Sequence, residues 1–197
     1  MKSVDKQIYE KIKRSKRGVV YFPENFSEYG SAGAIRIALH RLVANNEIKR
    51  VAQGIYVRPK ISPLVGEVLP STEEVAKEIA KRDRARIIPT GSYALNALGL
   101  STQVPLKLVL LTDGAPRTVK VGKRTILFKK TTPRNLAVKG KISALVIQAL
   151  KAIGNGRVSK EEEKVIIKQL HSENEKLLKH DIKLAPEWIA NIMRKAL

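Results

Sequence analysis

The sequence contains no cysteine among its 197 residues, which excludes disulfide bonds, thiol chemistry and cysteine-ligated zinc. Aromatic residues make up only 5% of the chain, so the core must be built mainly from Ile, Leu, Val and Ala. No stretch approaches the roughly 20 consecutive apolar residues of a membrane span, and the first residues open no apolar run typical of a signal peptide. We therefore expect a soluble, cytoplasmic protein with no membrane partner.

Acidic residues are also scarce, because 18 Asp and Glu stand against 38 Lys and Arg and leave a net charge of +20. Such a surplus attracts polyanions, through counterion release on nucleic acid or through the field of an anionic surface. Charge alone does not choose between DNA, RNA, lipid and an acidic protein. Hydrophobic residues are 43% of the chain, enough to bury a core and to exclude a disordered tail.

The first 60 residues predict helix, short strand, helix, helix and hairpin. Apolar residues at helical spacing predict a helix from Val4 that ends near Gly18, followed by a β-prone run at 19–22 and a short helix at 23–29. Ser31 is a good N-cap for a helix that runs to about Asn45. Two alternating runs, 47–51 and 55–59, flank a glycine-containing turn and predict a hairpin.

The rest of the chain predicts a linker and a second, mixed domain. Residues 61–70 are aperiodic and contain proline, whereas the residues after Ser71 favour a helix. Residues 87–89 form a short apolar run. Strands are predicted at 107–112, 118–121 and 125–130, and helices at 92–98, 142–153, 160–178 and 186–195. The predicted fold is therefore α+β: an N-terminal winged helix-turn-helix at 1–60, a linker at 61–70, and at 71–197 a mixed α/β domain with a small sheet and C-terminal helices.

The order of elements in residues 1–60 is the winged helix-turn-helix order, which suits duplex DNA. The polar face of the helix after Ser31 can enter the major groove, where Arg36 either reads guanine or contacts phosphate. The hairpin would then be the wing, with cations on phosphates and Gln53 at its tip. The candidate DNA-binding residues are Ser31, Gly33, Arg36, Ile37, His40, Arg41, Lys49, Arg50, Gln53, Tyr56 and Arg58, with Lys13, Arg14, Lys16 and Arg17 on the flanking backbone.

Two segments carry a family resemblance. The run Gly33–Leu42 followed by Ile48–Pro59 resembles the N-terminal domain of AbiEi-type antitoxins. Residues Pro89–Leu100, followed by a basic β-segment, are similar to the second domain of the same family. The resemblance covers roughly residues 5–150 and leaves the closing helices outside it.

The resemblance implies an antitoxin of a type IV toxin–antitoxin pair that also represses its own operon. The winged helix would bind operator repeats as a nucleoid-associated repressor, and the second domain would counteract a nucleotidyltransferase-like toxin. It also places Arg36, Arg41, Lys49, Arg50 and Arg58 at DNA-facing basic positions. The alternatives are a DNA-binding regulator with no toxin-neutralising role and an RNA-binding module that grips A-form helices by shape.

A basic stretch lies in the predicted strands of the second domain. Residues 107–141 hold ten Lys and Arg and a single acid, Asp113. Its candidate surface residues are Lys107, Arg117, Lys120, Lys123, Arg124, Lys129 and Lys130. These cations are either solvated, in contact with the DNA backbone, or opposed to an acidic partner such as a toxin.

No pattern of catalytic residues accompanies these features. Thr90-Gly91-Ser92 would suggest a nucleotidyltransferase only if paired carboxylates followed to hold magnesium, and Asp113 has no acidic partner nearby. The three histidines lack metal-ligand spacing, and no phosphate-binding glycine loop is present. We therefore expect no enzyme activity, no cofactor and no metal. The sequence specifies no oligomeric state.

Overall fold

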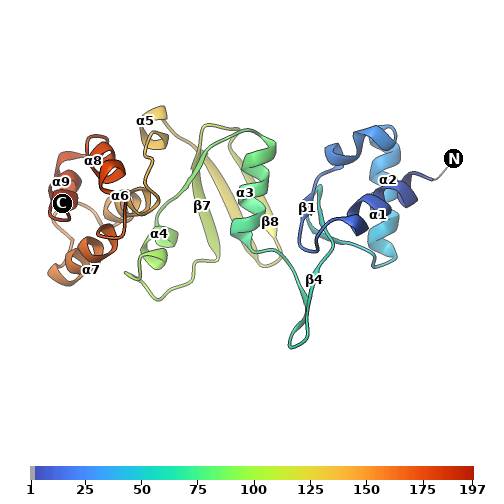
Figure 1. Ribbon diagram of the computed structural model, residues 1–197, viewed down its shortest axis with the longest axis horizontal. Helices are drawn as coiled ribbons and strands as arrows, with labels where there is room; N and C mark the ends of the chain where they lie inside the picture. The colour runs from blue at the N-terminus through green and yellow to red at the C-terminus, as the bar shows by residue number, and fades with distance from the viewer. Residues whose placement is uncertain (1–2) are drawn as a thin grey trace. The chain divides into compact units, whose positions relative to one another are not determined.

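The computed structural model describes residues 3–197 (Figure 1). The chain divides into two compact units: the first runs up to Glu78 and includes Val119–Lys123, and the second comprises Ile79–Thr118 and Arg124–Leu197. Helices and strands occur in both, so the chain is an α+β protein, as predicted. The division after Glu78 falls inside a helix, and the first unit is therefore longer than the predicted domain of residues 1–60.

The first unit begins with the predicted order of elements. These elements are α1 (Val4–Arg14), β1 (Val20–Tyr21), the 3-10 helix η1 (Pro23–Tyr29), α2 (Ala32–Ala44), β2 (Lys49–Ala52) and β3 (Ile55–Val57). The strands form one antiparallel sheet in the order β1-β3-β2. The β2–β3 turn carries Gly54 at a φ of +68°, a left-handed conformation that favours glycine.

One apolar core joins the helices of the first unit. Ile8 and Ile12 of α1 recur four residues apart, lie on one helix face, and pack with Phe26 of η1 and with Ile35 and Leu39 of α2. All five side chains are buried, and each buried side chain of this size contributes about 1.5–3 kcal/mol of transfer free energy. The core therefore fixes one face of α2 and leaves its opposite face in solvent.

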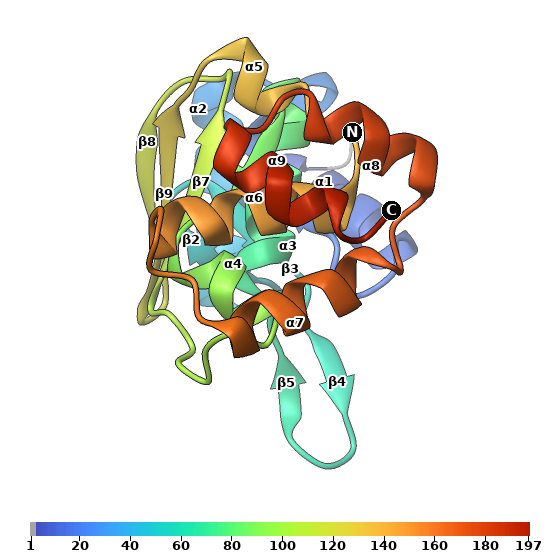
Figure 2. The same ribbon diagram turned by 90° about the vertical axis from the view of Figure 1, so that its left-hand side faces the viewer.

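The predicted linker contains a separate hairpin. Strands β4 (Lys60–Ser62) and β5 (Gly66–Val68) pair with each other in antiparallel fashion and form a two-stranded sheet of their own. Figure 2 shows this hairpin reaching away from the helices and strands of the first unit. Its strands escaped the sequence prediction because each is only three residues long and its residues are mostly exposed.

The second unit holds most of a four-stranded sheet, of which residues 119–121 are grouped with the first unit. Helix α3 (Thr72–Arg82) leads into it and begins at Ser71, whose side chain and backbone exchange hydrogen bonds with Glu74. The strands are β6 (Ile87–Pro89), β7 (Lys107–Thr112), β8 (Arg117–Val121) and β9 (Arg124–Lys130), in the spatial order β6-β7-β9-β8. Strands β7 and β9 are parallel, and β6 is antiparallel to β7. The three predicted strands are thus present, and the short apolar run at 87–89 forms a fourth, β6.

Helices complete the second unit. They are α4 (Ser92–Ala97), α5 (Pro133–Leu136), α6 (Lys141–Ile153), α7 (Lys160–Leu170), α8 (Glu175–Ile182) and α9 (Glu187–Arg194). The prediction of one helix over 160–178 is wrong, because Asn174 Oδ1 accepts the Lys176 and Leu177 N–H groups and starts a new helix. Among residues 3–197, no helix is both long and apolar enough to cross a bilayer.

Candidate nucleic-acid interface

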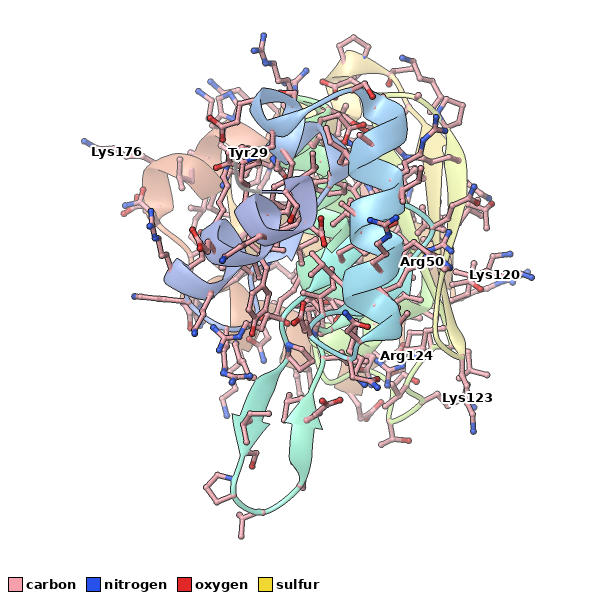
Figure 3. The ribbon with its side chains drawn as sticks, turned by 90° about the vertical axis from the view of Figure 1, so that its right-hand side faces the viewer. Tyr29, Arg50, Lys120, Lys123, Arg124 and Lys176 are labelled. Atoms are coloured by element: carbon pink, nitrogen blue, oxygen red, sulfur yellow. The ribbon has the colours of Figure 1, made fainter. Side chains whose placement is uncertain are left out.

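The outer face of α2 is free of acidic side chains. Gly33, Arg36, Ile37, His40 and Arg41 are all exposed on it. Their spacing of three and four residues places them along one stripe of the helix. The helix runs at the front of Figure 3. The structure therefore brings these five predicted residues together on one cationic surface.

The first turn of α2 leaves donors available beside this stripe. Ser31 Oγ accepts a hydrogen bond from the Ala34 N–H at 3.3 Å, so the predicted N-cap is confirmed. The N–H groups of a first helical turn have no partner within the helix and suit an anion. Arg36 Nε donates to Ala32 O at 3.3 Å, a bond that does not use the two terminal guanidinium nitrogens.

The β2–β3 hairpin divides the predicted residues into two groups. Arg50 and Gln53 are exposed, and Gln53 lies in the turn. Lys49 Nζ lies 3.2 Å from Asn46 Oδ1 and 3.5 Å from Glu67 Oε2, so its charge already has a partner. Tyr56 is only 8% exposed and belongs to the core. Arg50 and Gln53 are therefore the predicted residues of this hairpin whose side chains are available to a ligand, and the Tyr56 ring packs in the core.

The predicted DNA-binding cations near the end of α1 also fall into two groups, those that are exposed and those that bind a backbone carbonyl. Lys13, Arg14 and Lys16 are exposed. Arg58 Nη1 donates to Lys13 O at 3.1 Å, and Arg17 Nη1 donates to Pro59 O at 3.1 Å. Arg17 and Arg58 thus tie the end of α1 to the end of β3, which the sequence prediction did not anticipate.

Lys11 has a structural role that the sequence prediction missed. Its Nζ donates to Asn25 O at 2.7 Å and to Glu28 Oε1 at 2.8 Å, and it lies 5.6 and 5.4 Å from the centroids of the Phe26 and Tyr29 rings. Such cation–π geometry adds to the ion pair. The hydrogen bond from Lys11 lowers the pKa of the Glu28 carboxyl below its usual value. Lys11 therefore fastens η1 to α1.

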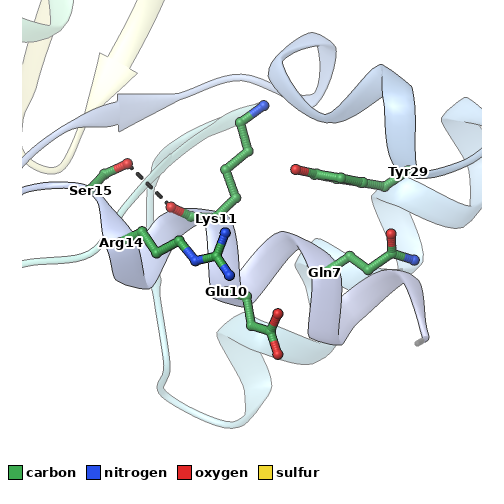
Figure 4. Close-up of a pocket in the computed structure, with 6 residues that line it drawn as sticks. All are labelled: Gln7, Glu10, Lys11, Arg14, Ser15 and Tyr29. Carbon is green, nitrogen blue, oxygen red and sulfur yellow. Dashed lines mark hydrogen bonds between the residues drawn. The ribbon is translucent and has the colours of Figure 1, made fainter. Parts of the chain in front are cut away.

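An open hollow lies beside Lys11, between α1 and the end of η1 (Figure 4). It is lined by Gln7, Glu10, Lys11, Arg14, Ser15 and Tyr29. Its charged groups are mixed in sign, and Ser15 Oγ is occupied by a hydrogen bond to Lys11 O at 3.2 Å. The hollow therefore lacks the uniform positive charge of the α2 stripe.

The basic stretch of the second domain includes two cations with structural partners. Arg117 forms an ion pair with Asp83 and lies 5.5 Å from the centroid of the Phe128 ring. Burial lowers the pKa of the Arg117 guanidinium. Lys130 Nζ donates to Asp113 O at 2.6 Å. Both were predicted as surface residues: Lys130 is exposed and Arg117 is only partly exposed, and both also hold parts of the fold together.

The other predicted cations of this stretch face solvent. They are Lys107, Lys120, Lys123, Arg124 and Lys129. Lys120 and Lys123 extend away from the ribbon in Figure 3. Ile126 and Phe128 of β9 are buried, whereas Thr125 and Leu127, which alternate with them, are partly exposed.

Asp113 is engaged by Arg86. The Arg86 backbone N–H donates to Asp113 Oδ1 at 2.7 Å, and Arg86 Nε donates to Oδ2 at 2.9 Å. These bonds lower the pKa of the Asp113 carboxyl. The Asp113 carboxylate therefore links the end of β7 to the residue that precedes β6.

The glycine of the Thr90-Gly91-Ser92 run is explained by its backbone conformation. Gly91 lies at the start of α4 and has a φ of +62°, which favours glycine.

Together these observations define an α+β protein of two units with a cationic, acid-free helix face in the first. The chain belongs to DUF6088, a family of unknown function, whose family model matches residues 7–178. The match runs from α1 into α8 and so includes the α2 stripe and the four-stranded sheet. A search of curated proteins gives no match.

Proposed function

We propose that this protein binds duplex DNA sequence-specifically through a winged helix-turn-helix formed by α1, α2 and the β2–β3 hairpin, and that it acts as a transcriptional repressor. The observation that carries the proposal is the exposed stripe of α2. It presents Arg36, His40 and Arg41 with no acid on the helix. Such a stripe suits the negative potential and the base edges of the major groove.

The way α2 is held supports a reading role. Base readout needs a helix that keeps its orientation while side chains probe the groove. Ile35 and Leu39 anchor α2 against Ile8 and Ile12 of α1. Because the anchoring residues and the exposed stripe lie on opposite sides of the helix, contact with DNA leaves the core intact. Arg36 is then the first candidate for a bidentate contact with guanine.

The surroundings of α2 supply the positions for phosphates. The N-terminus of α2 offers backbone N–H groups, and Arg50 extends from the hairpin that plays the part of the wing. Lys13, Arg14 and Lys16 add exposed cations after α1. Because the chain has a net charge of +20, we expect strong, salt-dependent affinity for any DNA. The base contacts would then add selectivity for particular sequences.

The resemblance of residues 33–59 and 89–100 to AbiEi-type antitoxins supports a finer form of the proposal. The protein would repress its own operon and counteract a nucleotidyltransferase-like toxin through its second domain. The test is co-expression with the product of an adjacent toxin-like gene. We expect growth rescue by the wild type and also by Arg36→Ala, because the two activities use different parts of the chain. Absence of rescue would leave a regulator without an antitoxin role.

The decisive test of DNA reading is a binding titration by fluorescence anisotropy at about 150 mM salt, where non-specific contacts are weakened. The full chain is titrated into a duplex from its own upstream region, a scrambled duplex and a double-stranded RNA of equal length. We expect at least tenfold preference for the upstream duplex. Equal affinity for all three would mean that net charge alone drives binding, and preference for the RNA would replace the proposal with A-form recognition.

A further inference from the structure

Ile37 is a large apolar side chain on the exposed face of α2. It is 56% exposed, whereas Ile35 and Leu39 of the same helix are buried in the core. Its exposure means that it contributes little to the core. Isoleucine also has a lower helix propensity than alanine, so it does not favour the helix. Neither packing nor helix formation therefore accounts for an isoleucine at this position.

Basic side chains surround Ile37. Arg36 precedes it, and His40 and Arg41 follow one turn along the same face. All three are exposed, and α2 carries no acidic residue. A protein partner that covered Ile37 with an apolar surface would desolvate these basic groups without pairing them, which is costly. A partner that fits this surface must therefore combine negative charge with an apolar group.

The major groove of duplex DNA offers that combination. Phosphates flank the groove, guanine O6 and N7 are acceptors that suit Arg36, and the C5-methyl group of thymine is an apolar group on a base edge. Adjacent residues of a helix are separated by a rise of about 1.5 Å, whereas successive base pairs are about 3.4 Å apart. Arg36 and Ile37 therefore face the same base pair or neighbouring ones.

Gly33 leaves space beside Ile37. A helical side chain leans toward the N-terminus of its helix and covers the preceding turn, so the Ile37 side chain extends toward the turn that contains Gly33. A Cβ added at Gly33 would meet no atom closer than 4.0 Å. The surface beside Ile37 is therefore open, and a methyl group on a base edge can contact the isoleucine without displacing a neighbour.

From these observations we propose that Ile37 is a specificity-determining residue that packs against the C5-methyl group of a thymine, on the base pair that Arg36 contacts or on a neighbouring one. The inference rests on the proposed DNA-binding function and adds the identity of one base to it. Burial of one methyl group strengthens binding by a factor of about four. Because the contact is apolar, it contributes selectivity without adding to the salt dependence of binding.

The test replaces thymine by uracil, which removes the C5-methyl group and keeps the hydrogen-bonding groups of the base. Each thymine of the upstream duplex is replaced in turn, and the affinity of the full chain is measured by fluorescence anisotropy at about 150 mM salt. We expect uracil to weaken binding by about three- to fivefold at one position or more. A series in which no replacement weakens binding would overturn the inference.

Matched variants assign the methyl effect to a residue. Ile37→Ala shortens the side chain and introduces a good helix former, and Ile61→Ala makes the same change at an isoleucine of β4 that is 57% exposed. We expect Ile37→Ala to bind the thymine and uracil duplexes equally, and Ile61→Ala to keep the wild-type difference. A difference that persists in Ile37→Ala would show that uracil acts through another residue or through DNA shape, and would refute the inference.

The outcomes also separate this inference from the proposed function. If the wild type prefers the upstream duplex to the scrambled one but no uracil weakens binding, DNA reading stands and the role of Ile37 falls. If the wild type does not prefer the upstream duplex, both fall. Far-UV circular dichroism of Ile37→Ala checks that the helix is retained.

Discussion

The buried carboxylate of Asp181 accepts a hydrogen bond from the Gly140 backbone N–H at 2.7 Å, immediately before α6 begins. Its other oxygen accepts the Lys139 N–H at 3.0 Å. Glu173 Oε2 accepts the N–H groups of Ile142 and Ser143 at 2.8 and 3.1 Å. Two carboxylates from distant parts of the chain thus satisfy the first turn of α6, where the helix dipole favours negative charge.

We expect Asp181→Ala to lower the free energy of unfolding by about 2–4 kcal/mol, because it leaves the buried Gly140 N–H and the partly buried Lys139 N–H without an acceptor. Urea denaturation followed by circular dichroism measures the change. Asp181→Asn keeps one acceptor oxygen and should lose less. Glu175→Ala removes an exposed acid of α8 and serves as the control. Superimposable transitions for Asp181→Ala and Glu175→Ala would contradict the capping role.

Gly140 leaves no room for a side chain beside the two carboxylates. A Cβ there would lie 2.5 Å from Glu173 Oε2 and 2.9 Å from Asp181 Oδ2. We expect Gly140→Ala to destabilise the protein by about 1–3 kcal/mol, because the carboxylates must move off the helix end. The control, Gly33→Ala, meets no atom closer than 4.0 Å and should stabilise α2 by up to about 1 kcal/mol. Changes of the same sign in thermal unfolding would refute the steric argument.

The Lys11–Glu28 link predicts a pH dependence. The pKa of Glu28 is lower in the folded protein than its ordinary value of 4.5, so its stabilising contribution is present above that value and is lost as pH falls through the folded pKa. We expect the stability difference between wild type and Glu28→Gln to be largest near neutral pH and to vanish at low pH. A difference that stays constant as the pH falls from neutral to below the folded pKa of Glu28 would mean that charge pairing is not its origin.

Arg36→Ala tests base reading directly. If the Arg36 guanidinium contacts a guanine, its removal should weaken binding to the upstream duplex by about 1–3 kcal/mol and leave binding to scrambled duplex almost unchanged. Arg157→Ala removes another exposed arginine, outside the helices, and should affect neither. Equal losses on both duplexes would reassign Arg36 to a phosphate.

Substitution of Arg117 should lower stability, whereas substitution of the lysines of the β8–β9 region should lower DNA affinity. Arg117→Ala removes the ion pair with Asp83 and the stacking on Phe128, and we expect it to cost about 1–2 kcal/mol of stability. Lys120→Ala/Lys123→Ala should leave stability unchanged and weaken binding to both duplexes equally. If both lysines contact phosphates, the salt slope falls by about 2. An unchanged slope would show that these lysines do not touch DNA.

Most elements could be predicted from the sequence because their signals are local. Ile8 and Ile12 mark a buried helix face by spacing, Ser31 marks a helix start, and Gly54 marks the turn of a hairpin. The exposed stripe of α2 follows from the same periodicity, since the residues that are not needed for the core face outward. Its use in DNA binding stays a prediction.

Sequence patterns failed at two places. Continued helical periodicity predicted one helix over 160–178, but Glu173 turns toward the start of α6 and Asn174 caps α8. The β4–β5 hairpin was predicted as linker because its strands are only three residues long and neither buries an apolar face.

The sequence by itself determined the α+β class, the basic charge and the positions of most helices and strands, since these depend on composition and on spacings of a few residues. The tertiary structure alone decided which cations are free to meet a partner. Arg17, Arg58 and Arg117 bind carbonyls or a carboxylate 34 to 45 residues away, whereas Arg50 and Lys120 remain exposed. A side chain's charge is set by its identity, but its availability depends on which groups the fold brings beside it.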